Sequence, residues 1–465
     1  MGDGGTGKTS ALLAAHCHIM KIGGRCTPPV VSVYVPLPTL RDVRDDGELA
    51  RVVREQLGVA TDADVEALVA MCTVVVLLDS FDEARVTCAP SEWHPLLRHP
   101  VFRHVRCVVS SRIDRVKSLG GPARAVAAAD SLGVFYVAPF DDGDSDDFVL
   151  RCAGSKVDVT RSRLNTFHLA ADDRRLPVVL RMAVELALND DVALPDTDLP
   201  VGTRSWLYWR YLQLRIRAGL RKLKALSNDA VDVYWRALEA TALGMVARDD
   251  AALPLKHVWS ALSDRSLRPA AVAACIPCRV EAADDGDASF SFWHKTLAEF
   301  AAAHALWRDP TATLQSLPNP FSRSEQWAPV LWWFHDLAQL NGPRRTAVVH
   351  DALLRDVLGS QRRLGFADQS RSTVSNAVAL IGASSEPLQG ADLSGLYVTD
   401  CNLEGARLDG CDLRKSSLVQ CVLRNASLQQ CNVDDLHVTN NVYDGPLPAL
   451  RGHTNRVTAV SITSD

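Results

Sequence analysis

Apolar residues follow two spacings through the larger part of this 465-residue chain. Short, mostly apolar segments at 30–35, 74–78 and 107–109 have the length and composition of strands in a parallel sheet. Stretches such as 10–20 and 295–306 instead carry apolar residues at helical spacing. Strands that alternate with helices in this way predict a parallel α/β domain, followed by further helices.

A third spacing begins at residue 388, where an apolar residue recurs at every fifth position without a break. An α-helix turns about 100° per residue, so five residues leave successive side chains about 140° apart around its surface. The pattern therefore requires a solenoid, in which the chain turns once per repeat. The eleven recurring residues are Leu388, Leu393, Val398, Leu403, Leu408, Leu413, Leu418, Leu423, Leu428, Val433 and Val438.

A small residue stands two places before most of these positions, and in four repeats it is Cys401, Cys411, Cys421 or Cys431. Thiols at regular spacing would suit a ladder of metal ligands. A free cysteine is also a small side chain that is usually buried, and this property fits the small-residue position better. We therefore expect the four thiols to pack inside the solenoid.

Residues 2–9 read GDGGTGKT, which fits the phosphate-loop pattern G-x-x-x-x-G-K-[ST]. Glycines let backbone N–H groups approach one phosphate, the lysine supplies a cation, and the threonine hydroxyl suits Mg²⁺. Such a loop normally follows a buried strand, whereas only Met1 precedes it here. The residues expected to hold the nucleotide phosphates are Gly2, Gly4, Gly5, Gly7, Lys8, Thr9 and Ser10.

The apolar run at 74–78 ends in Asp79, and Asp82 and Glu83 follow closely. Carboxylates at the carboxyl end of a parallel strand lie where such sheets bind ligands. We expect Asp79 to hold Mg²⁺ together with Thr9, either directly or through water. Asp82 or Glu83 is expected to orient an attacking water molecule.

Arg112 follows the predicted strand at 107–109 after two serines. Parallel strands end at one edge of their sheet, so this guanidinium is expected near Asp79. The planar fork of arginine can bond two oxygens at once, which suits a γ-phosphate. We therefore expect Arg112 to read the γ-phosphate.

The order of GDGGTGKT, VVVLLDSFDEA and CVVSSRIDR resembles the NACHT group of signal-transduction NTPases. The second motif of that group carries the extra acidic pair seen here at Asp82 and Glu83. Two later segments, LPVVL at 176–180 and FSFWHKTLAEFAAA at 290–303, extend the resemblance over residues 2–306.

This resemblance implies roles for two residues far from the phosphate loop. Pro177 would touch the adenine, and His294 would reach the β-phosphate in a closed, ADP-bound state. The residues alone favour a different role for His294, because a histidine at the start of a helix is more often a packing or capping residue.

The five-residue repeat resembles the pentapeptide-repeat family. That resemblance implies a right-handed square β-helix with inward-pointing apolar residues and about four repeats per coil, stacked about 4.8 Å apart. Residues 450–465, LRGHTNRVTAVSITSD, look like the opening of a WD-repeat. A propeller needs about four to eight blades, so we interpret the chain as an internal piece of a longer protein, a fragment.

The expected fold is multidomain: α/β, then α, then β-solenoid. Within the helical part we expect Trp327, Leu331, Trp332 and Phe334 to form the core. The expected division is a P-loop nucleotide-binding domain without its first strand at 1–135, a helical lid at 136–200, a winged-helix-like domain at 201–306, a helical domain at 307–385, the pentapeptide β-helix at 386–440, and a linker with a truncated WD-repeat strand at 441–465.

Composition narrows the function classes. The 50 Lys and Arg residues against 55 Asp and Glu, with 47% hydrophobic residues, exclude wholesale disorder and a chain built around nucleic acid. Twelve scattered cysteines without a signal-peptide pattern predict reduced thiols and a cytoplasmic location. The apolar runs are far shorter than the roughly 20 residues of a membrane span, so we expect no membrane association.

Together these features predict a STAND-type signalling switch. It would bind ATP and ADP with Mg²⁺, hydrolyse ATP slowly as a regulatory step, and recruit protein partners through its repeat tail, with nucleotide-dependent homo-oligomers in the full-length form. The alternative is a non-hydrolysing scaffold with a vestigial nucleotide site, favoured by the lack of a strand before the phosphate loop. A metabolic ATP-dependent enzyme is disfavoured because no acceptor-substrate motif lies beside the phosphate residues.

Overall fold

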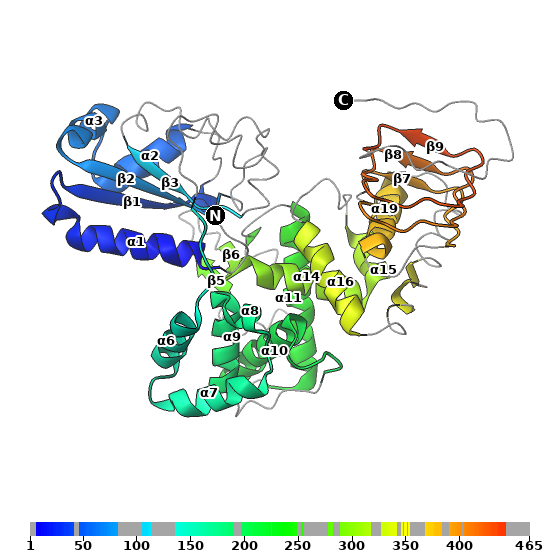
Figure 1. Ribbon diagram of the computed structural model, residues 1–465, viewed down its shortest axis with the longest axis horizontal. Coiled ribbons are helices and arrows are strands. Elements are labelled where there is room, and N and C mark those ends of the chain that lie inside the picture. Colours follow the sequence, from blue (N-terminus) through cyan, green and yellow to red (C-terminus); the bar gives the residue numbers. More distant parts are fainter. Residues whose placement is uncertain are drawn as a thin grey trace. The chain divides into compact units, whose positions relative to one another are not determined.

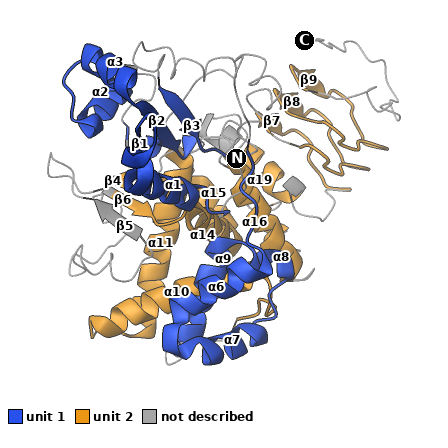
Figure 2. Ribbon diagram, turned by 60° about the vertical axis from the view of Figure 1, so that its left-hand side comes forward, with its two compact units in different colours: residues 1–190 blue, residues 191–465 orange. Residues whose placement is uncertain are grey.

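The chain divides into two compact units, residues 1–190 and 191–465, in this computed structural model (Figure 1 and Figure 2). The finer division into six parts stays a prediction. The structure describes residues 6–40, 46–81, 105–112, 135–189, 197–224, 226–248, 253–254, 278–281, 289–317, 327–341, 346, 348–350, 352–353, 368–383, 390–401 and 403–442.

The first unit contains a three-stranded sheet with helices around it, and then a group of short helices. Its elements are α1 (Lys8–Ile22), η1 (Gly23–Arg25), β1 (Val30–Pro36), η2 (Leu37–Thr39), α2 (Asp46–Leu57), α3 (Asp62–Met71), β2 (Thr73–Asp79), β3 (Arg106–Val109), α6 (Asp142–Ala153), η6 (Gly154–Lys156), α7 (Val157–Thr166), α8 (Ala171–Arg174) and α9 (Pro177–Leu188).

The three strands form a parallel sheet in the order β1-β2-β3, which confirms the three predicted strands and their direction. The register pairs Val30 with Thr73 at one end and Pro36 with Asp79 at the other. The turn that leads from α1 into β1 requires a glycine, because a Cβ at Gly23 would lie 2.0 Å from the carbonyl oxygen of Val30.

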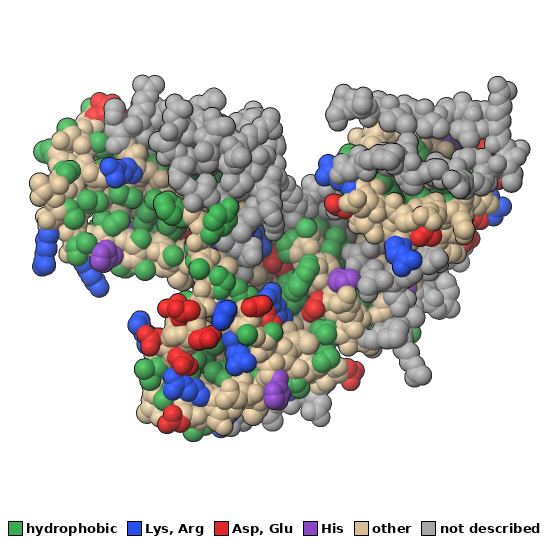
Figure 3. All heavy atoms as spheres, viewed as in Figure 1, with side chains coloured by type: hydrophobic (Ala, Val, Ile, Leu, Met, Phe, Trp, Pro, Cys, Tyr) green, Lys and Arg blue, Asp and Glu red, His purple; other side chains and the backbone are tan. Residues whose placement is uncertain are grey.

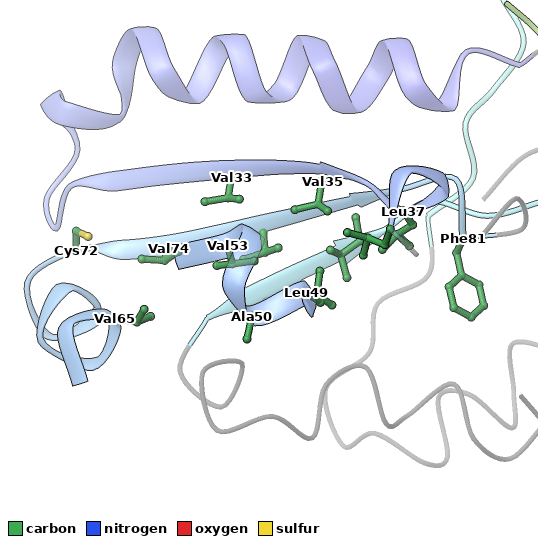
Figure 4. Close-up of a cluster of buried hydrophobic side chains, with 13 residues drawn as sticks. Val33, Val35, Leu37, Leu49, Ala50, Val53, Val65, Cys72, Val74 and Phe81 are labelled. Atoms are coloured by element: carbon green, nitrogen blue, oxygen red, sulfur yellow. The ribbon is translucent and has the colours of Figure 1, made fainter. Parts of the chain in front are cut away.

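The two faces of the sheet are covered by different helices. Successive side chains of a strand point to opposite faces. Val33, Val35 and Val74 point away from α1 into an apolar core that they share with α2 and α3 (Figure 4), and Val76 and Leu78 belong to the same core. The opposite face packs against α1. The sheet is therefore covered on both faces, as its apolar strands predict.

The helices α6 to α9 form a second group within this unit. Capping boxes begin two of the helices in the unit, with Thr61 and Asp64 at α3 and Asp141 and Asp144 at α6. Val149 of α6 packs against α9, and Phe148 and Leu164 add partly buried contacts to the same cluster. The group is thus held together by a small apolar core.

Acidic and basic side chains lie close together on the outer surface of this group (Figure 3). Exposed pairs of this kind contribute about 0–1 kcal/mol each, so they add little to the stability of the unit. The pairs are Arg151–Asp147, Arg161–Asp146 and Arg175–Asp142, at 3.8, 3.5 and 3.3 Å.

The second unit contains a helical part with a small sheet, followed by the repeat tail. Its elements are α10 (Arg204–Lys222), α11 (Asn228–Arg248), β4 (Leu253–Pro254), β5 (Cys278–Glu281), β6 (Ser289–Phe292), α14 (Lys295–Arg308), α15 (Pro310–Ser316), α16 (Trp327–Leu340), α19 (Asp368–Ala383), β7 (Tyr397–Thr399), β8 (Ser417–Val419) and β9 (His437–Thr439). The strands β4, β6 and β5 form an antiparallel sheet in that order.

Helix α14 lies at the centre of the helical part, where it packs against α11 and α16. Phe292, just before this helix, and Leu297, Phe300 and Ala301 within it are all buried. A buried carboxylate also joins two of the helices: Glu239 of α11 accepts hydrogen bonds from His304 and Arg308 of α14. The Trp235 indole N–H also donates to Glu239, at 3.0 Å. Because such a charge is costly to bury alone, these partners are needed to keep Glu239 ionised in the core.

The predicted core of α16 is partly wrong. Trp327 and Phe334 are buried and Leu331 is half-buried, but the Trp332 side chain is 48% exposed. Trp333 fills the core in its place, because residue 333 lies about 60° around the helix from the buried Val330, whereas residue 332 lies about 160° from it. The Trp332 ring instead packs against Trp333 and lies 5.9 Å from the guanidinium carbon of Arg204.

The repeat tail is a β-helix whose coil is twenty residues long. Strands β7, β8 and β9 are parallel, with Val398, Leu418 and Val438 in register. Four pentapeptides therefore make one coil, as predicted, although the handedness stays a prediction. Main-chain hydrogen bonds join successive coils, for example from Leu393 N–H to the carbonyl of Asp412, at 2.9 Å.

The central residue of each repeat and the small residue before it point inward. Central residues from Leu393 to Val433 are buried, and so are Ser416 and the four cysteines. Burial decreases at the last coil, where Val438 is half-buried. The N-terminal end of the stack is covered by α19, whose Ser375 hydroxyl accepts a hydrogen bond from the backbone N–H of Thr399.

The residue two places after each central residue has a left-handed backbone with positive φ. Only glycine adopts this conformation at low cost, and asparagine and aspartate tolerate it better than other residues. In this tail the position is also occupied by lysine and glutamine. The eleven residues, with φ from 52° to 75°, are Gly390, Gly395, Asp400, Gly405, Gly410, Lys415, Gln420, Asn425, Gln430, Asp435 and Asn440.

Among the described residues, no helix combines the length and the apolar character needed to cross a bilayer.

Candidate functional site

The structure describes residues 6–9 of the phosphate-loop motif, and these residues lead directly into α1. Gly7, with φ 89° and ψ 22°, is the left-handed residue immediately before α1. Its carbonyl accepts the N–H of Ala11 at 2.8 Å, so the helix starts directly from the loop. A residue with a side chain would be strained at this φ, which explains the glycine at this position. Lys8 and Thr9 are half-buried and Ser10 is exposed.

Five predicted phosphate-site and water-orienting positions cannot be placed in this geometry. Gly2, Gly4 and Gly5 lie outside the described residues, and so do Asp82 and Glu83. The phosphate contacts of these glycines and the water-orienting role of the two carboxylates stay predictions.

Pro177 lies against the phosphate loop. It is the first residue of α9, where proline is favoured because the missing N–H would have no partner in the helix. A Cβ built at Gly7 would lie 3.5 Å from the Cγ atom of Pro177, which is ordinary van der Waals contact. The structure therefore brings together two residues that are 170 positions apart in the sequence and that were both predicted to touch the nucleotide. Contact with adenine stays a prediction.

Asp79 faces the same side of the sheet as α1. Alternation along β2 puts Val74, Val76 and Leu78 in the core on the far face, so Leu77 and Asp79 point toward the α1 face. Asp79 is also the last residue of its strand. The carboxylate consequently lies at the carboxyl end of the strand and on the face covered by the phosphate-loop helix.

The Asp79 carboxylate is held on both of its oxygens, although its side chain is only 2% exposed. The Ser110 hydroxyl donates to Oδ1 at 2.5 Å, and the Tyr34 hydroxyl donates to Oδ2 at 2.8 Å. A buried carboxylate without such donors would carry a large desolvation cost. The Tyr34 hydroxyl comes from β1 and the Ser110 hydroxyl from the residue directly after β3, so the group is fixed from both sides.

The ends of β2 and β3 are tied together around this carboxylate. Ser80 has a left-handed backbone, with φ 60°, and its N–H donates to the Ser110 hydroxyl at 2.8 Å. The N–H of Phe81 donates to the Ser110 carbonyl, and the N–H of Ser110 donates to the Leu78 carbonyl, both at 2.9 Å. Arg112 follows this junction and is half-buried. Its role toward a γ-phosphate stays a prediction.

A second polar contact links α1 to the sheet. Nδ1 of His16 lies 2.8 Å from the Ser32 hydroxyl, and the His16 and Tyr34 rings are 6.2 Å apart. Sequence reasoning missed Ser32, Tyr34 and Ser110 as members of the site. A signal was present: Ser32 and Tyr34 alternate with valines in an otherwise apolar strand, so they share one face.

His294 caps a helix in the second unit. It is the residue before α14, and its Nδ1 accepts the backbone N–H of Thr296 at 3.3 Å and lies 2.7 Å from the Thr296 hydroxyl. The same hydroxyl lies 2.8 Å from that of Tyr208. The capping role, which the residues alone favoured, is therefore present. The β-phosphate contact that the NACHT resemblance implied stays a prediction.

The four cysteines of the tail form two stacks inside the β-helix, Cys401 with Cys421 and Cys411 with Cys431, one coil apart. Their thiols lie near carbonyl oxygens: Cys431 Sγ is 2.9 Å from the carbonyl of Leu408. Burial raises the pKa of all four thiols, to about 12 for Cys411 and about 11 for Cys421. Neutral, packed thiols agree with the expected packing role.

Solved structures similar to this chain include the following two. The first is described as the structure of the Aeropyrum pernix ORC2 protein in ADPNP-ADP complexes, with 13% identity over 63% of this chain and 82% of that chain, at a TM-score of 0.31. The second is the crystal structure of Cdc6p from Pyrobaculum aerophilum, with 14% identity, coverage of 66% and 87%, and a TM-score of 0.27. These TM-scores are too low for either similarity to support an argument about this chain.

No curated protein matches the sequence. The tail, in contrast, matches a known family, described as Pentapeptide repeats, in 8 copies over residues 388–425 and 401–435. The match agrees with the observed coil of four pentapeptides and with the buried central residues. Residues 388–435 are therefore identified as pentapeptide repeats.

Proposed function

We propose that this chain is an ATP/ADP-binding P-loop switch of the NACHT kind, with a pentapeptide-repeat tail that serves as a platform for protein partners. In this proposal, nucleotide exchange and slow, regulatory hydrolysis of ATP change the conformation of the chain. The tail then presents or withholds a surface for partners, and the full-length protein forms nucleotide-dependent oligomers.

One observation carries the proposal most strongly. Asp79 is buried at the carboxyl end of β2, on the face of the sheet that packs against α1, and α1 begins directly at the Gly7 turn. Parallel sheets bind ligands at this edge, and a helix N-terminus favours phosphate. A buried carboxylate held by two hydroxyls is costly to maintain and is hard to explain by packing alone.

The roles we propose follow from the chemistry of each side chain. Lys8 neutralises the β- and γ-phosphates, Arg112 reads the γ-phosphate, and Asp82 or Glu83 orients the attacking water. Pro177 lies against the adenine, and His294 holds the ADP form closed.

The donors present also fit magnesium. The Asp79 carboxylate and the Thr9 hydroxyl are hard oxygen ligands, which Mg²⁺ prefers along with water and phosphate oxygens. The described part of the chain has no group of three or more His, Cys, Asp or Glu residues that could enclose a metal ion. This suits a cation that arrives with the nucleotide, where it would neutralise phosphate charge.

A second candidate function is a scaffold whose nucleotide site is vestigial. The observation that favours it is the family match, which covers only the repeat tail. The WD-repeat opening predicted at 450–465 would extend such a scaffold, but it lies outside the described residues.

The test of the proposal is equilibrium binding of fluorescent ADP and ATP to the full chain, with and without Mg²⁺. The informative variant is Lys8→Ala, and Lys21→Ala is its matched control, because Lys21 is an exposed lysine at the other end of α1. We expect Lys8→Ala to weaken binding about 10- to 100-fold, since it removes a charge-assisted hydrogen bond. Lys21→Ala should bind as the wild type does.

The two candidate functions give different results. Micromolar binding that depends on Lys8 and not on Lys21 supports the switch. If folded wild-type protein bound neither nucleotide, the switch would be excluded and the scaffold would remain.

A further inference from the structure

Tyr34 reaches the Asp79 carboxylate from the neighbouring strand β1. The residue opposite Asp79 in the sheet is Pro36, so Tyr34 lies two positions back on the same face. Its side chain spans this offset, and its hydroxyl donates to Oδ2 at 2.8 Å. No nucleotide-binding motif of this sequence assigns a role to Tyr34.

The backbone of Tyr34 is fixed independently of its side chain. β1 is the edge strand of the described sheet, so its outer backbone groups are not paired with another strand of that sheet. The Gln56 side chain of α2 pairs with them: Oε1 accepts the Tyr34 N–H at 3.2 Å, and Nε2 donates to the Tyr34 carbonyl at 2.9 Å. α2 therefore holds the main chain while the phenol extends toward the opposite face.

The two hydroxyl donors define the orientation of the carboxylate. Ser110 holds Oδ1 and Tyr34 holds Oδ2, so rotation about the last side-chain bond of Asp79 would break both hydrogen bonds. Each carboxylate oxygen has two lone pairs, so each retains acceptor capacity beyond its hydroxyl. Partners that orient a metal-binding carboxylate strongly affect the affinity for the metal.

We propose that Tyr34 is a positioning residue that sets the affinity of the nucleotide site for its divalent cation by fixing the Asp79 carboxylate. This inference rests on the proposed nucleotide-binding function. Tyr34 acts through Asp79 and need not touch the nucleotide. Its removal should therefore change the dependence of binding on Mg²⁺ and leave metal-free binding unchanged.

The experiment titrates Mg²⁺ into the full chain with fluorescent ADP, for wild type, Tyr34→Phe and Tyr136→Phe. Phenylalanine keeps the ring and deletes only the hydroxyl. Tyr136 is the matched control, because it lies in the same unit and its side chain is 61% exposed. We expect Tyr34→Phe to raise the Mg²⁺ concentration for half-maximal effect by about 10-fold, the lower end of the effect of lost metal-orienting partners. Binding in EDTA should be unchanged, and Tyr136→Phe should match wild type.

The outcomes separate this inference from the proposed function. If the wild type binds no nucleotide in a Lys8-dependent way, both are wrong. If binding depends on Lys8 and Mg²⁺ but Tyr34→Phe has a wild-type Mg²⁺ dependence, only the inference is wrong. Equal weakening with and without Mg²⁺ would show that the hydroxyl has a merely structural role, and this too contradicts the inference.

Circular dichroism checks that each variant is folded. If Tyr34→Phe fails this check, Ser110→Ala provides the second test, because it deletes the hydroxyl that holds the other oxygen of Asp79. An unchanged Mg²⁺ dependence in folded Ser110→Ala would contradict the idea that these hydroxyls position the carboxylate.

Discussion

The parallel sheet and the repeat tail are both made of parallel strands, but they are built from contacts of different sequence range. Tyr34 and Asp79 are 45 positions apart and occur once, whereas each coil of the tail repeats the contacts of the coil twenty residues before it. A repeating structure is stabilised by many equivalent neighbours, and a single site depends on a few contacts that occur nowhere else. Damage to the tail should therefore stay local, and damage to the sheet should reach the site.

The largest expected difference between the two regions is in the rate at which their cysteines are alkylated. A thiol whose pKa is raised from 9.0 to about 12, as in Cys411, has about a thousandth of the usual thiolate fraction. We expect Cys411 and Cys421 to resist iodoacetamide at pH 8, while the exposed Cys17 and Cys152 react. Peptide mass spectrometry measures each rate.

Urea-unfolded protein is the control for that experiment, because all these thiols should then react at similar rates. Rapid labelling of Cys411 in the folded chain would show that the coils open readily, and it would contradict the tightly packed tail.

The second prediction compares the consequences of truncating one buried leucine in each region. Leu78 of β2 and Leu413 of the tail are both buried, with 0% and 2% exposure, and each truncation to alanine should cost about 2–5 kcal/mol. Leu413→Ala should increase hydrogen exchange only in the coils, because each coil contacts only its neighbours. Leu78→Ala should also weaken ADP binding, because it precedes Asp79.

A Leu413→Ala variant that loses ADP binding would show that the two regions are coupled. In that case the separation of a repeating platform from a single site would be wrong.

The smallest effect tests the left-handed position of the repeats. Gln430 has φ 58°, whereas the adjacent Gln429 does not have a positive φ, and both side chains are exposed. Gln430→Gly should stabilise the tail by about 1 kcal/mol, because glycine relieves the strain of this conformation. Gln429→Gly should destabilise it by about 0.5–1 kcal/mol. The measurement is the urea concentration at which the tail amides lose protection, and equal shifts for both variants would contradict the backbone assignment.

The repeat tail could be predicted largely from the sequence, because its period is local and continuous. The period required a solenoid, and the resemblance to pentapeptide repeats implied the inward leucines and the coil of four repeats. The left-handed position could not be predicted, since glycine, aspartate, lysine and glutamine share it. In α16 the helical pattern did not identify every core residue correctly. Trp332 was predicted to be in the core, but it lies off the apolar face.

The site could be predicted only in the parts that follow a motif, such as Gly7, Lys8 and Asp79. Tyr34 was missed because its contact with Asp79 depends on the register of two strands that are far apart in the sequence. Ser110 was noted only as a neighbour of Arg112, since a serine after a strand carries no signal about the carboxylate it holds. Non-local pairing is the information that the sequence pattern lacks.

The central claim, that nucleotide binds at the start of α1 and the end of β2, is tested most directly by hydrogen exchange with and without Mg²⁺-ADP. The first N–H groups of a helix have no partner within the helix, so phosphate should protect residues 7–10 when it binds there. With ADP at about 100 times its Kd, we expect exchange at residues 7–10 and 80–81 to slow by up to about 100-fold, and the amides of residues 411–423 to be unaffected. Saturating ADP that left residues 7–10 unprotected would contradict the account.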